Sequence, residues 1–302
     1  MCADSRRVDL ALLVRTLLFS RDALLVGRLG NVEAQDAVRI HQRKRASYML
    51  ANNAGVFFSN ASERSGVERH FMLNYMDAVR SSDMMMVVHD QCDETLYFAC
   101  HFRLDRLFLD ARWIHYYALA DWLQLLQRLA DERARVIVVT GFPQTVARQL
   151  PRLARIHPEH NLSGLSVSLF AAPLAWSWNR DAVKDPNWAV ALERLRSDAP
   201  WRAAEPEGAP RVRRSARGAR AVALLGCGAF GMPLASDAKR HGVSAIYVGG
   251  LLPVLFGVAG ERHRRLPDVA ASINQHWTRP LPEETPARRS KLQDGSPHGV
   301  YW

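Results

Sequence analysis

The stretch AVALLGCGAFGMPLASDAKRHGVSAIYV, residues 221–248, constrains the fold of this chain more than any other. Residues 221–225 are an uninterrupted apolar run, which is typical of a parallel strand covered on both faces. A turn follows that contains Gly226, Gly228 and Gly231. Residues 233–240 have the start and stop signals of a helix, and residues 244–248 form a second apolar strand. This order predicts one strand–helix–strand unit of a parallel α/β sheet.

The glycine turn has a functional and a structural interpretation. Its GCGAFG sequence fits the GxGxxG pattern of dinucleotide sites, and a helix N-terminus after a strand favours a phosphate. We therefore expect Gly226, Gly228 and Gly231 to approach the phosphates of a nucleotide. A nicotinamide site also needs a carboxylate at the end of the second strand, and none occurs between Asp237 and Glu261. The alternative is that the glycines only allow close packing.

A second candidate site lies near the start of the chain, in RLGNVE at residues 28–33. It follows the apolar stretch at residues 23–27, which we expect to be a strand, and it leads into a helix. A cation, Arg28, thus stands with Gly30 and the carboxylate of Glu33 where open α/β sheets bind ligands. Glu33 is a candidate base or ligand; alternatively, it only favours the N-terminus of its own helix.

Polar residues also follow the expected strand at residues 84–88. They are His89, Asp90, Asp93 and Glu94. Such side chains could serve as metal ligands or as general bases, although their spacing is specific to neither, and Glu94 is a second candidate catalytic base. A helix that begins near Asp93 would explain both acids equally well.

The remaining pattern predicts a single α/β domain over residues 1–302, with a Rossmann-like, mostly parallel sheet and helices on both faces. Residues 96–117 are rich in aromatic side chains and are expected in the core. Residues 198–220 resemble a surface loop, and residues 277–302 an extended tail. Further helices are expected at 63–80, 120–133, 144–156 with a break at Pro151, 187–197 and 269–276, and further strands at 136–140 and 166–172.

Composition limits the class of protein. The net charge of +10 favours anionic partners, but the arginines are spread along the chain, so we expect no nucleic-acid groove. The four cysteines show neither paired nor zinc-like spacing, and no apolar run is long enough to span a bilayer. These features favour a cytoplasmic protein that at most touches the inner face of a membrane.

Several motifs together resemble those of the bacterial GT-D-fold glycosyltransferases. They are RLGNVE, PQTVA at 143–147, the helix of Trp188, LLGCGAFGMPLASDAKRHG, YVGG, FGVAGER, HWTRP at 276–280 and the terminal YW. They occur in matching order over nearly the whole chain, most densely at residues 221–280.

The resemblance implies a Rossmann-like fold and the transfer of a sugar from a nucleotide donor, typically a UDP-sugar, to a glycan or glycolipid acceptor. It also implies a divalent metal ion, Mn²⁺ or Mg²⁺, at the positions of Asn31 and Glu33, with Arg28, Gly30 and Arg262 binding the nucleotide. Family members have an acidic residue where this chain has Asn31, and tend to have tryptophan in place of His263. The first departure puts the metal in question.

The expected chemistry suits these residues. Glycosyl transfer leaves negative charge on the departing diphosphate, so a site needs cations or N–H groups directed at it. Arg28 and the glycine turn meet that need, and Glu33 or Glu94 could deprotonate an acceptor hydroxyl. Two other classes stay open: a binding protein of the same fold that has lost catalysis, and a nicotinamide oxidoreductase.

Overall fold

The computed structural model describes residues 16–17, 20, 22–47, 50–86, 97–98, 100, 107–109, 119–173, 184–202 and 221–285. The described strands form one seven-stranded sheet in the order β3-β2-β1-β7-β6-β4-β5, and every pair is parallel. This confirms the expected parallel α/β fold. The strands are β1 (Leu25–Arg28), β2 (Met84–Met86), β3 (Leu107–Leu109), β4 (Arg135–Thr140), β5 (Ser166–Ala171), β6 (Ala221–Gly226) and β7 (Ser244–Tyr247).

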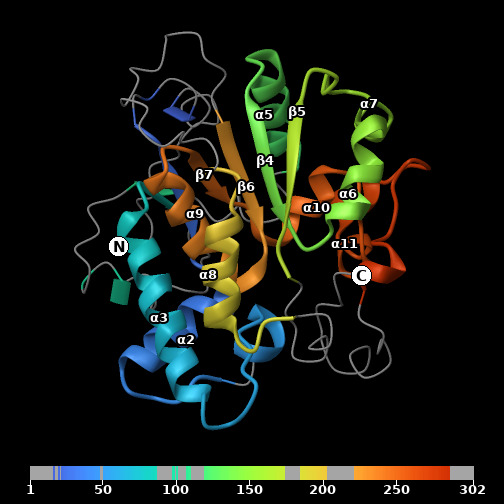
Figure 1. Ribbon diagram of the computed structural model, residues 1–302. Coiled ribbons are helices and arrows are strands. Elements are labelled where there is room, and N and C mark those ends of the chain that lie inside the picture. The colour runs from blue at the N-terminus through green and yellow to red at the C-terminus, as the bar shows by residue number, and fades with distance from the viewer. Residues whose placement is uncertain are drawn as a thin grey trace.

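Helices cover both faces of this sheet (Figure 1). One face packs against α2 (Asn31–His41), α3 (Arg64–Ser81), α8 (Trp188–Asp198) and α9 (Gly231–Arg240). The other packs against α5 (Leu119–Asp131), α6 (Pro143–Gln149), α7 (Leu153–Ile156), α10 (Leu252–Leu255) and α12 (Pro267–Ser272). The central strands are buried on both faces, which explains their continuous apolar sequences. No helix in these ranges is long and apolar enough to cross a bilayer.

Most element types agree with the sequence pattern, and the differences have local causes. The helix expected at 144–156 is broken at Pro151 into α6, a 3₁₀ turn and α7, because proline cannot donate a helical hydrogen bond. The helix expected at 269–276 is instead α12, which ends at Ser272. The chain then turns where the side chain of Asn274 accepts a hydrogen bond from His276 N at 2.9 Å. Strand β3, within the aromatic segment, was not expected from the sequence.

Neighbouring strands send their connections to opposite faces at the centre of the sheet. The chain leaves β1 into α2 on one face, and it leaves β7 into α10 on the other. Because ligands of open α/β sheets bind where adjacent connections diverge at the carboxyl ends, the β1–β7 boundary is the expected binding edge.

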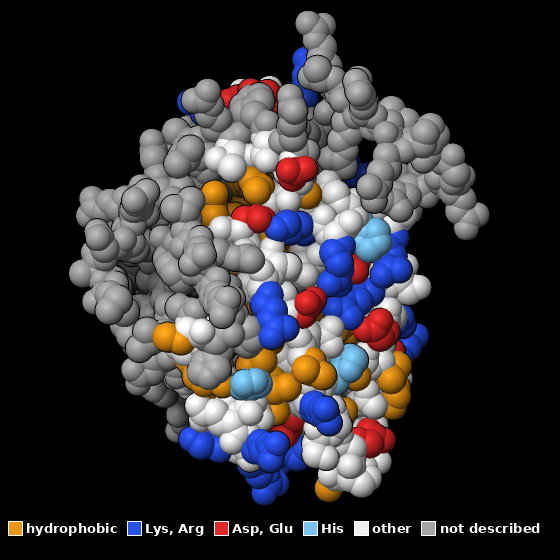
Figure 2. Space-filling view, turned by 90° about the vertical axis from the view of Figure 1, so that its left-hand side faces the viewer, with side chains coloured by type: hydrophobic (Ala, Val, Ile, Leu, Met, Phe, Trp, Pro, Cys, Tyr) orange, Lys and Arg blue, Asp and Glu red, His pale blue; other side chains and the backbone are white. Residues whose placement is uncertain are grey.

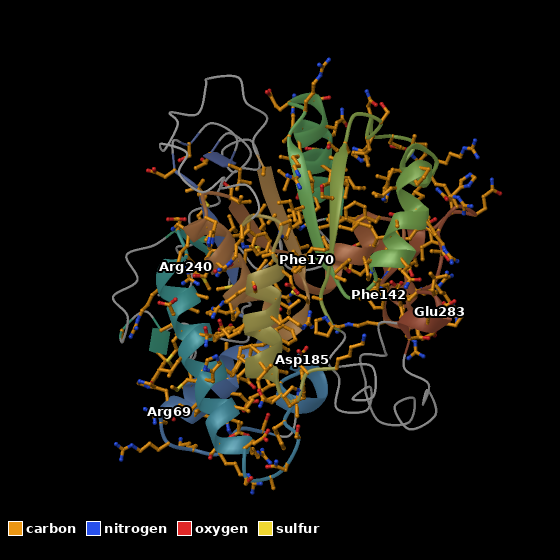
Figure 3. All side chains as sticks on the ribbon, viewed as in Figure 1. Arg69, Phe142, Phe170, Asp185, Arg240 and Glu283 are labelled. Carbon is orange, nitrogen blue, oxygen red and sulfur yellow. The ribbon has the colours of Figure 1, made fainter. Side chains whose placement is uncertain are left out.

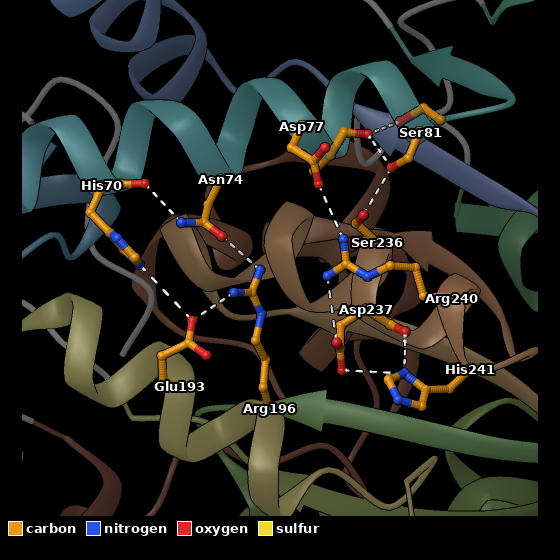
Figure 4. A network of polar contacts seen from close by, with 12 residues as sticks. His70, Asn74, Asp77, Ser81, Glu193, Arg196, Ser236, Asp237, Arg240 and His241 are labelled. Atoms are coloured by element: carbon orange, nitrogen blue, oxygen red, sulfur yellow. Dashed lines mark hydrogen bonds and ion pairs between the residues drawn. The ribbon is translucent and has the colours of Figure 1, made fainter.

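Polar side chains join the three helices α3, α8 and α9 on one face (Figure 4). Arg196 on α8 donates to Asn74 on α3 at 2.7 Å, and Arg240 on α9 pairs with Asp77 on α3 at 3.1 Å. Such partly exposed pairs each stabilise a fold by well under about 1 kcal/mol. Their main consequence is to fix α9, and with it the glycine turn, against the helices that carry the rest of this face.

The start of α9 lies directly beneath the ring of Tyr247, the last residue of β7. A Cβ atom placed on Gly231 would lie 2.2 Å from the ring carbon Cε2 of Tyr247. This distance is too short for any side chain at position 231. The third glycine of GCGAFG is therefore required for helix–strand packing.

We predict that Gly231→Ala lowers the free energy of unfolding by about 1–3 kcal/mol, the usual cost of overpacking a core. The matched control is Gly66→Ala in α3, where an added Cβ meets nothing within 4 Å. That change should be neutral or stabilise by about 0.5 kcal/mol, because alanine favours helix. Urea unfolding of the two variants checks this, and equal stabilities would contradict the packing role of Gly231.

Candidate functional site

The guanidinium of Arg28 lies at the carboxyl end of β1, over the loop that follows β7. Its Nη1 donates to Val248 O at 3.4 Å, and a Cβ on Gly249 would lie only 1.8 Å from Nη1. Gly249 also has a φ of 71°, a conformation that favours glycine. Nε of Arg28 is buried and has no hydrogen-bond partner in the described part of the chain. Arg28 thus keeps a desolvated donor, which an anionic ligand could satisfy.

Glu33 lies in the first turn of α2 and is buried, with 9% of its surface exposed. Its Oε1 lies 3.3 Å from the hydroxyl of Tyr247, which is also 3.0 Å from the carbonyl oxygen of Gly228. The carboxylate folds over Gly30, where an added Cβ would meet Oε2 at 2.4 Å. Among the described residues Glu33 has no ion-pair partner. Tyr247 therefore joins the two turns that the sequence singled out.

Two buried tyrosines surround the Glu33 carboxylate. Burial raises the pKa of Tyr247 well above its ordinary value, and the charge of Glu33 raises it further. The pKa of Tyr75, on α3, is raised for the same two reasons, and its hydroxyl is 3.5 Å from the carbonyl oxygen of Arg28. Both phenols stay protonated at physiological pH, so they act as hydrogen-bond donors.

Protein atoms surround the other two glycines of the turn as well. A Cβ on Gly226 would lie 2.7 Å from Gly249 O, and one on Gly228 would lie 2.6 Å from Ala54 O. Ala54 ends the π-helical turn Leu50–Ala54. Close packing thus accounts for all three glycines. Contact with a nucleotide phosphate at Gly226, Gly228 or Gly231 stays a prediction.

His263 ties the short helix α11 (Glu261–Arg264) to the loop beneath Arg28. Its Nδ1 accepts from Gly260 N at 3.2 Å, and its Nε2 lies 3.2 Å from Gly250 O, to which it donates as the neutral Nε2–H tautomer. Burial, and then the nearby charge of Arg262, lower the pKa of His263 to about 4. Arg262, the neighbour of His263 in α11, consequently lies in the segment that His263 holds against Gly250.

A carboxylate of the protein already occupies the N-terminus of α6, at the same edge of the sheet. Glu284 accepts from Gln144 N at 2.6 Å and Thr145 N at 2.9 Å. Figure 3 shows the neighbouring Phe142 and Glu283 on the same side of the molecule. Residues 277–285, the start of the expected tail, are thus held against the sheet. This helix end does not offer a second phosphate position.

The described side chains near Glu33 were compared with the needs of a divalent metal ion. No group of three His, Cys, Asp or Glu side chains in the described ranges could hold a metal ion. Glu33 supplies one carboxylate there, and it is hydrogen-bonded to Tyr247. Asn31 begins α2, but its side chain is outside the described part. The expected Mn²⁺ or Mg²⁺ site at Asn31 and Glu33 therefore stays a prediction, with Glu33 as the one described side chain that could hold the ion.

The structure brings most of the expected site residues to one edge. Glu33 meets the glycine turn through Tyr247 and folds over Gly30, Arg28 lies against Gly249 after β7, and Arg262 lies on α11. Glu94 and the neighbouring His89, Asp90 and Asp93 lie outside the described residues. The sequence did not identify Tyr247 or Tyr75 as site residues. The sequence position of Tyr247 could have indicated its role, because it lies near the end of the second strand, where a dinucleotide-binding unit has its ribose-binding carboxylate.

Comparison with known proteins adds one weak match. No family model and no curated protein matches the sequence. A solved structure described as a new glycosyltransferase (DUF1792) from Streptococcus sanguinis aligns over 92% of this chain and 95% of that one. The TM-score is 0.41 and the sequence identity 12%, and a match at this level carries no argument about activity.

We predict that protonation of His263 destabilises the fold. The folded-state pKa of about 4 lies below the ordinary 6.5, so the stabilisation is complete above pH 6.5 and is lost as pH falls towards 4. The full loss is about 3.5 kcal/mol, at about 1.4 kcal/mol per pKa unit, and about 2.5 kcal/mol of it should occur between pH 7 and pH 4.5. Urea unfolding at pH 7 and pH 4.5 measures it.

The matched variant is His263→Gln, which keeps a donor for Gly250 O but does not titrate. Its stability should fall less between the two pH values than that of the wild-type protein. An equal fall in both would show that other groups cause the pH dependence, such as His157, whose pKa burial also lowers to about 4.

Proposed function

We propose that this protein is a glycosyltransferase that moves a sugar from a nucleotide donor, with UDP-sugars the expected class, to an acceptor. The acceptor is a glycan, glycolipid or glycoprotein in bacterial surface polysaccharide or glycoconjugate synthesis. The observation that carries the proposal is the presence of an arginine with a buried, unsatisfied Nε and of a buried carboxylate in one turn at the β1–β7 boundary. Arg28 and Glu33 belong to the RLGNVE turn, and Tyr247 connects that turn to GCGAFG. The motif resemblance supports the same reaction.

The charge distribution matches the demands of glycosyl transfer. When the bond between the sugar and the diphosphate breaks, negative charge develops on the departing oxygens. Arg28 has donors to stabilise that charge, including the buried Nε. Glu33 would accept the proton of the acceptor hydroxyl as it attacks the anomeric carbon. None of these steps is assigned to a metal ion.

A nicotinamide oxidoreductase is less compatible with the observed turn. The ring of Tyr247 lies against Gly231, and its hydroxyl contacts Gly228 O, so protein covers the turn from the side of β7. No carboxylate follows β7 to hold a ribose. A binding protein without catalysis differs from our proposal only in turnover, so the experiments below separate binding from transfer.

We predict that UDP or a UDP-sugar raises the melting temperature and that NAD does not. A ligand at a hundredfold excess over its Kd stabilises the folded state by about 2.7 kcal/mol, an easily measured shift. Thermal denaturation with UDP, a panel of UDP-sugars and NAD, each with EDTA or with Mn²⁺, tests it. Stabilisation by NAD and by no nucleotide sugar would overturn the assignment. Stabilisation that depends on Mn²⁺ would support the expected metal ion.

We predict that Glu33→Gln lowers transfer at least about a hundredfold, the usual contribution of a positioned base, while binding of the donor changes little. Tyr247→Phe removes one donor to Glu33 and should cause a smaller loss. Release of UDP from the stabilising donor measures transfer. Glu193→Gln, on the exposed surface of α8, is the control and should behave as wild type.

Full activity in Glu33→Gln with a lowered melting temperature would show that Glu33 only stabilises the start of α2. Binding of the donor without any turnover by the wild-type protein would favour the non-catalytic alternative.

A further inference from the structure

A strongly basic turn follows α2, at the opposite end of this helix from Glu33. We call Arg39, Arg43, Lys44 and Arg45 the basic turn; all four side chains are exposed. There is no Asp or Glu anywhere in residues 37–62. Among the described residues, Arg43, Lys44 and Arg45 form no ion pair, and Arg39 has only Asp36, at 3.8 Å. The positive charge of the turn is therefore available to a partner.

Hydrogen bonds hold the basic turn in one conformation. Asp36 is buried and accepts from Ser47 N at 2.7 Å and Ser47 Oγ at 2.6 Å, which closes the turn at its base. Nε of Arg39 donates to Arg45 O at 3.2 Å. The cations are thus presented on a formed surface, which lowers the conformational entropy lost on binding.

Arg43 has a φ of 60°, in the left-handed region. At this position after a helix, glycine would be the favoured residue, and arginine is disfavoured there. The chain therefore carries a local conformational cost at the centre of the basic turn.

We propose that the basic turn binds the surface of an anionic lipid bilayer. Lipid phosphates meet the exposed cations, and each Lys or Arg near such a surface raises binding about fivefold. The arginines of the chain are spread along its sequence, a pattern that makes nucleic acid a poorer partner. Figure 2 shows one face of the molecule, on which Lys and Arg side chains lie both near the middle and at the lower end.

The biological reason for membrane binding by the basic turn rests on the proposed function. The eleven residues of α2 span about 16 Å between the RLGNVE turn and the basic turn. A bilayer held at the basic turn would therefore lie within reach of a lipid-linked acceptor at the candidate site. The binding itself needs neither donor nor acceptor, so it can be tested separately.

The experiment is sedimentation of the full chain with vesicles of phosphatidylcholine containing 30% phosphatidylglycerol, and with pure phosphatidylcholine vesicles. We expect binding only to the anionic vesicles at about 50 mM salt, and loss of binding at about 0.5 M salt because the charges are screened. Replacing Arg43, Lys44 and Arg45 by glutamine should lower the partition coefficient about a hundredfold, from about fivefold for each charge.

The matched control replaces three exposed arginines of α6, α7 and the turn between them, Arg148, Arg152 and Arg155, by glutamine. It changes the net charge equally and should bind vesicles as wild type does. Equal losses in both triple variants would show that only the overall charge matters, and would overturn the proposal. Absence of binding to the anionic vesicles, or preferred binding of RNA through the same three residues, would also overturn it.

A single change separates binding from folding. Arg43→Gly removes one charge and relieves the left-handed conformation, so it should raise the melting temperature while weakening vesicle binding about fivefold. Unchanged vesicle binding in this variant would count against the basic turn. If vesicles bind and no nucleotide sugar does, the proposed function fails and this inference stands; the reverse result removes only the inference.

Discussion

The hydroxyl of Tyr247 contacts Gly228 O and Glu33 Oε1, and the organisation of the candidate site depends on this contact. Gly228 and Glu33 are nearly two hundred residues apart in the sequence, yet each begins the connection that follows a strand. The ring of Tyr247 reaches both because position 231 has no side chain. Loss of this arrangement would separate the Glu33 carboxylate from the glycine turn.

The contact between Arg28 and Gly249 likewise depends on a glycine that leaves room for a side chain. Gly249 allows the guanidinium of Arg28 to lie against the loop after β7, where it donates to Val248 O. His263 then holds the next residue, Gly250, from the other side. The glycines of YVGG and GCGAFG thus leave space in which side chains of the protein itself pack. A phosphate, if it binds here, would meet Arg28 and the adjacent backbone, on a surface that these contacts have already shaped.

Position and chemistry of the site agree with the rules for parallel sheets. The partly buried Arg28 and the buried Glu33 stand where the connections of β1 and β7 diverge to opposite faces. At the other end of α2 the basic turn carries exposed positive charge, and residues 37–62 contain no Asp or Glu. One helix thereby joins a desolvated polar cluster to a cationic surface, an arrangement suited to an enzyme whose acceptor lies at a membrane.

The local pattern of the sequence was enough to determine the parallel α/β class and the strands β4, β6 and β7. It also determined the break at Pro151 and the position of Glu33 in the first turn of its helix. These features are local because apolar runs, proline and glycine act over a few residues. The sequence also identified both turns as candidate sites. It could not show that Tyr247 joins them, that Gly249 underlies Arg28, or that Glu284 occupies the N-terminus of α6. Those contacts link residues far apart in the chain, and they exist only because parallel strands bring their carboxyl ends to one edge. Short-range periodicity contains no information about which connections meet there, so the tertiary structure alone decided them.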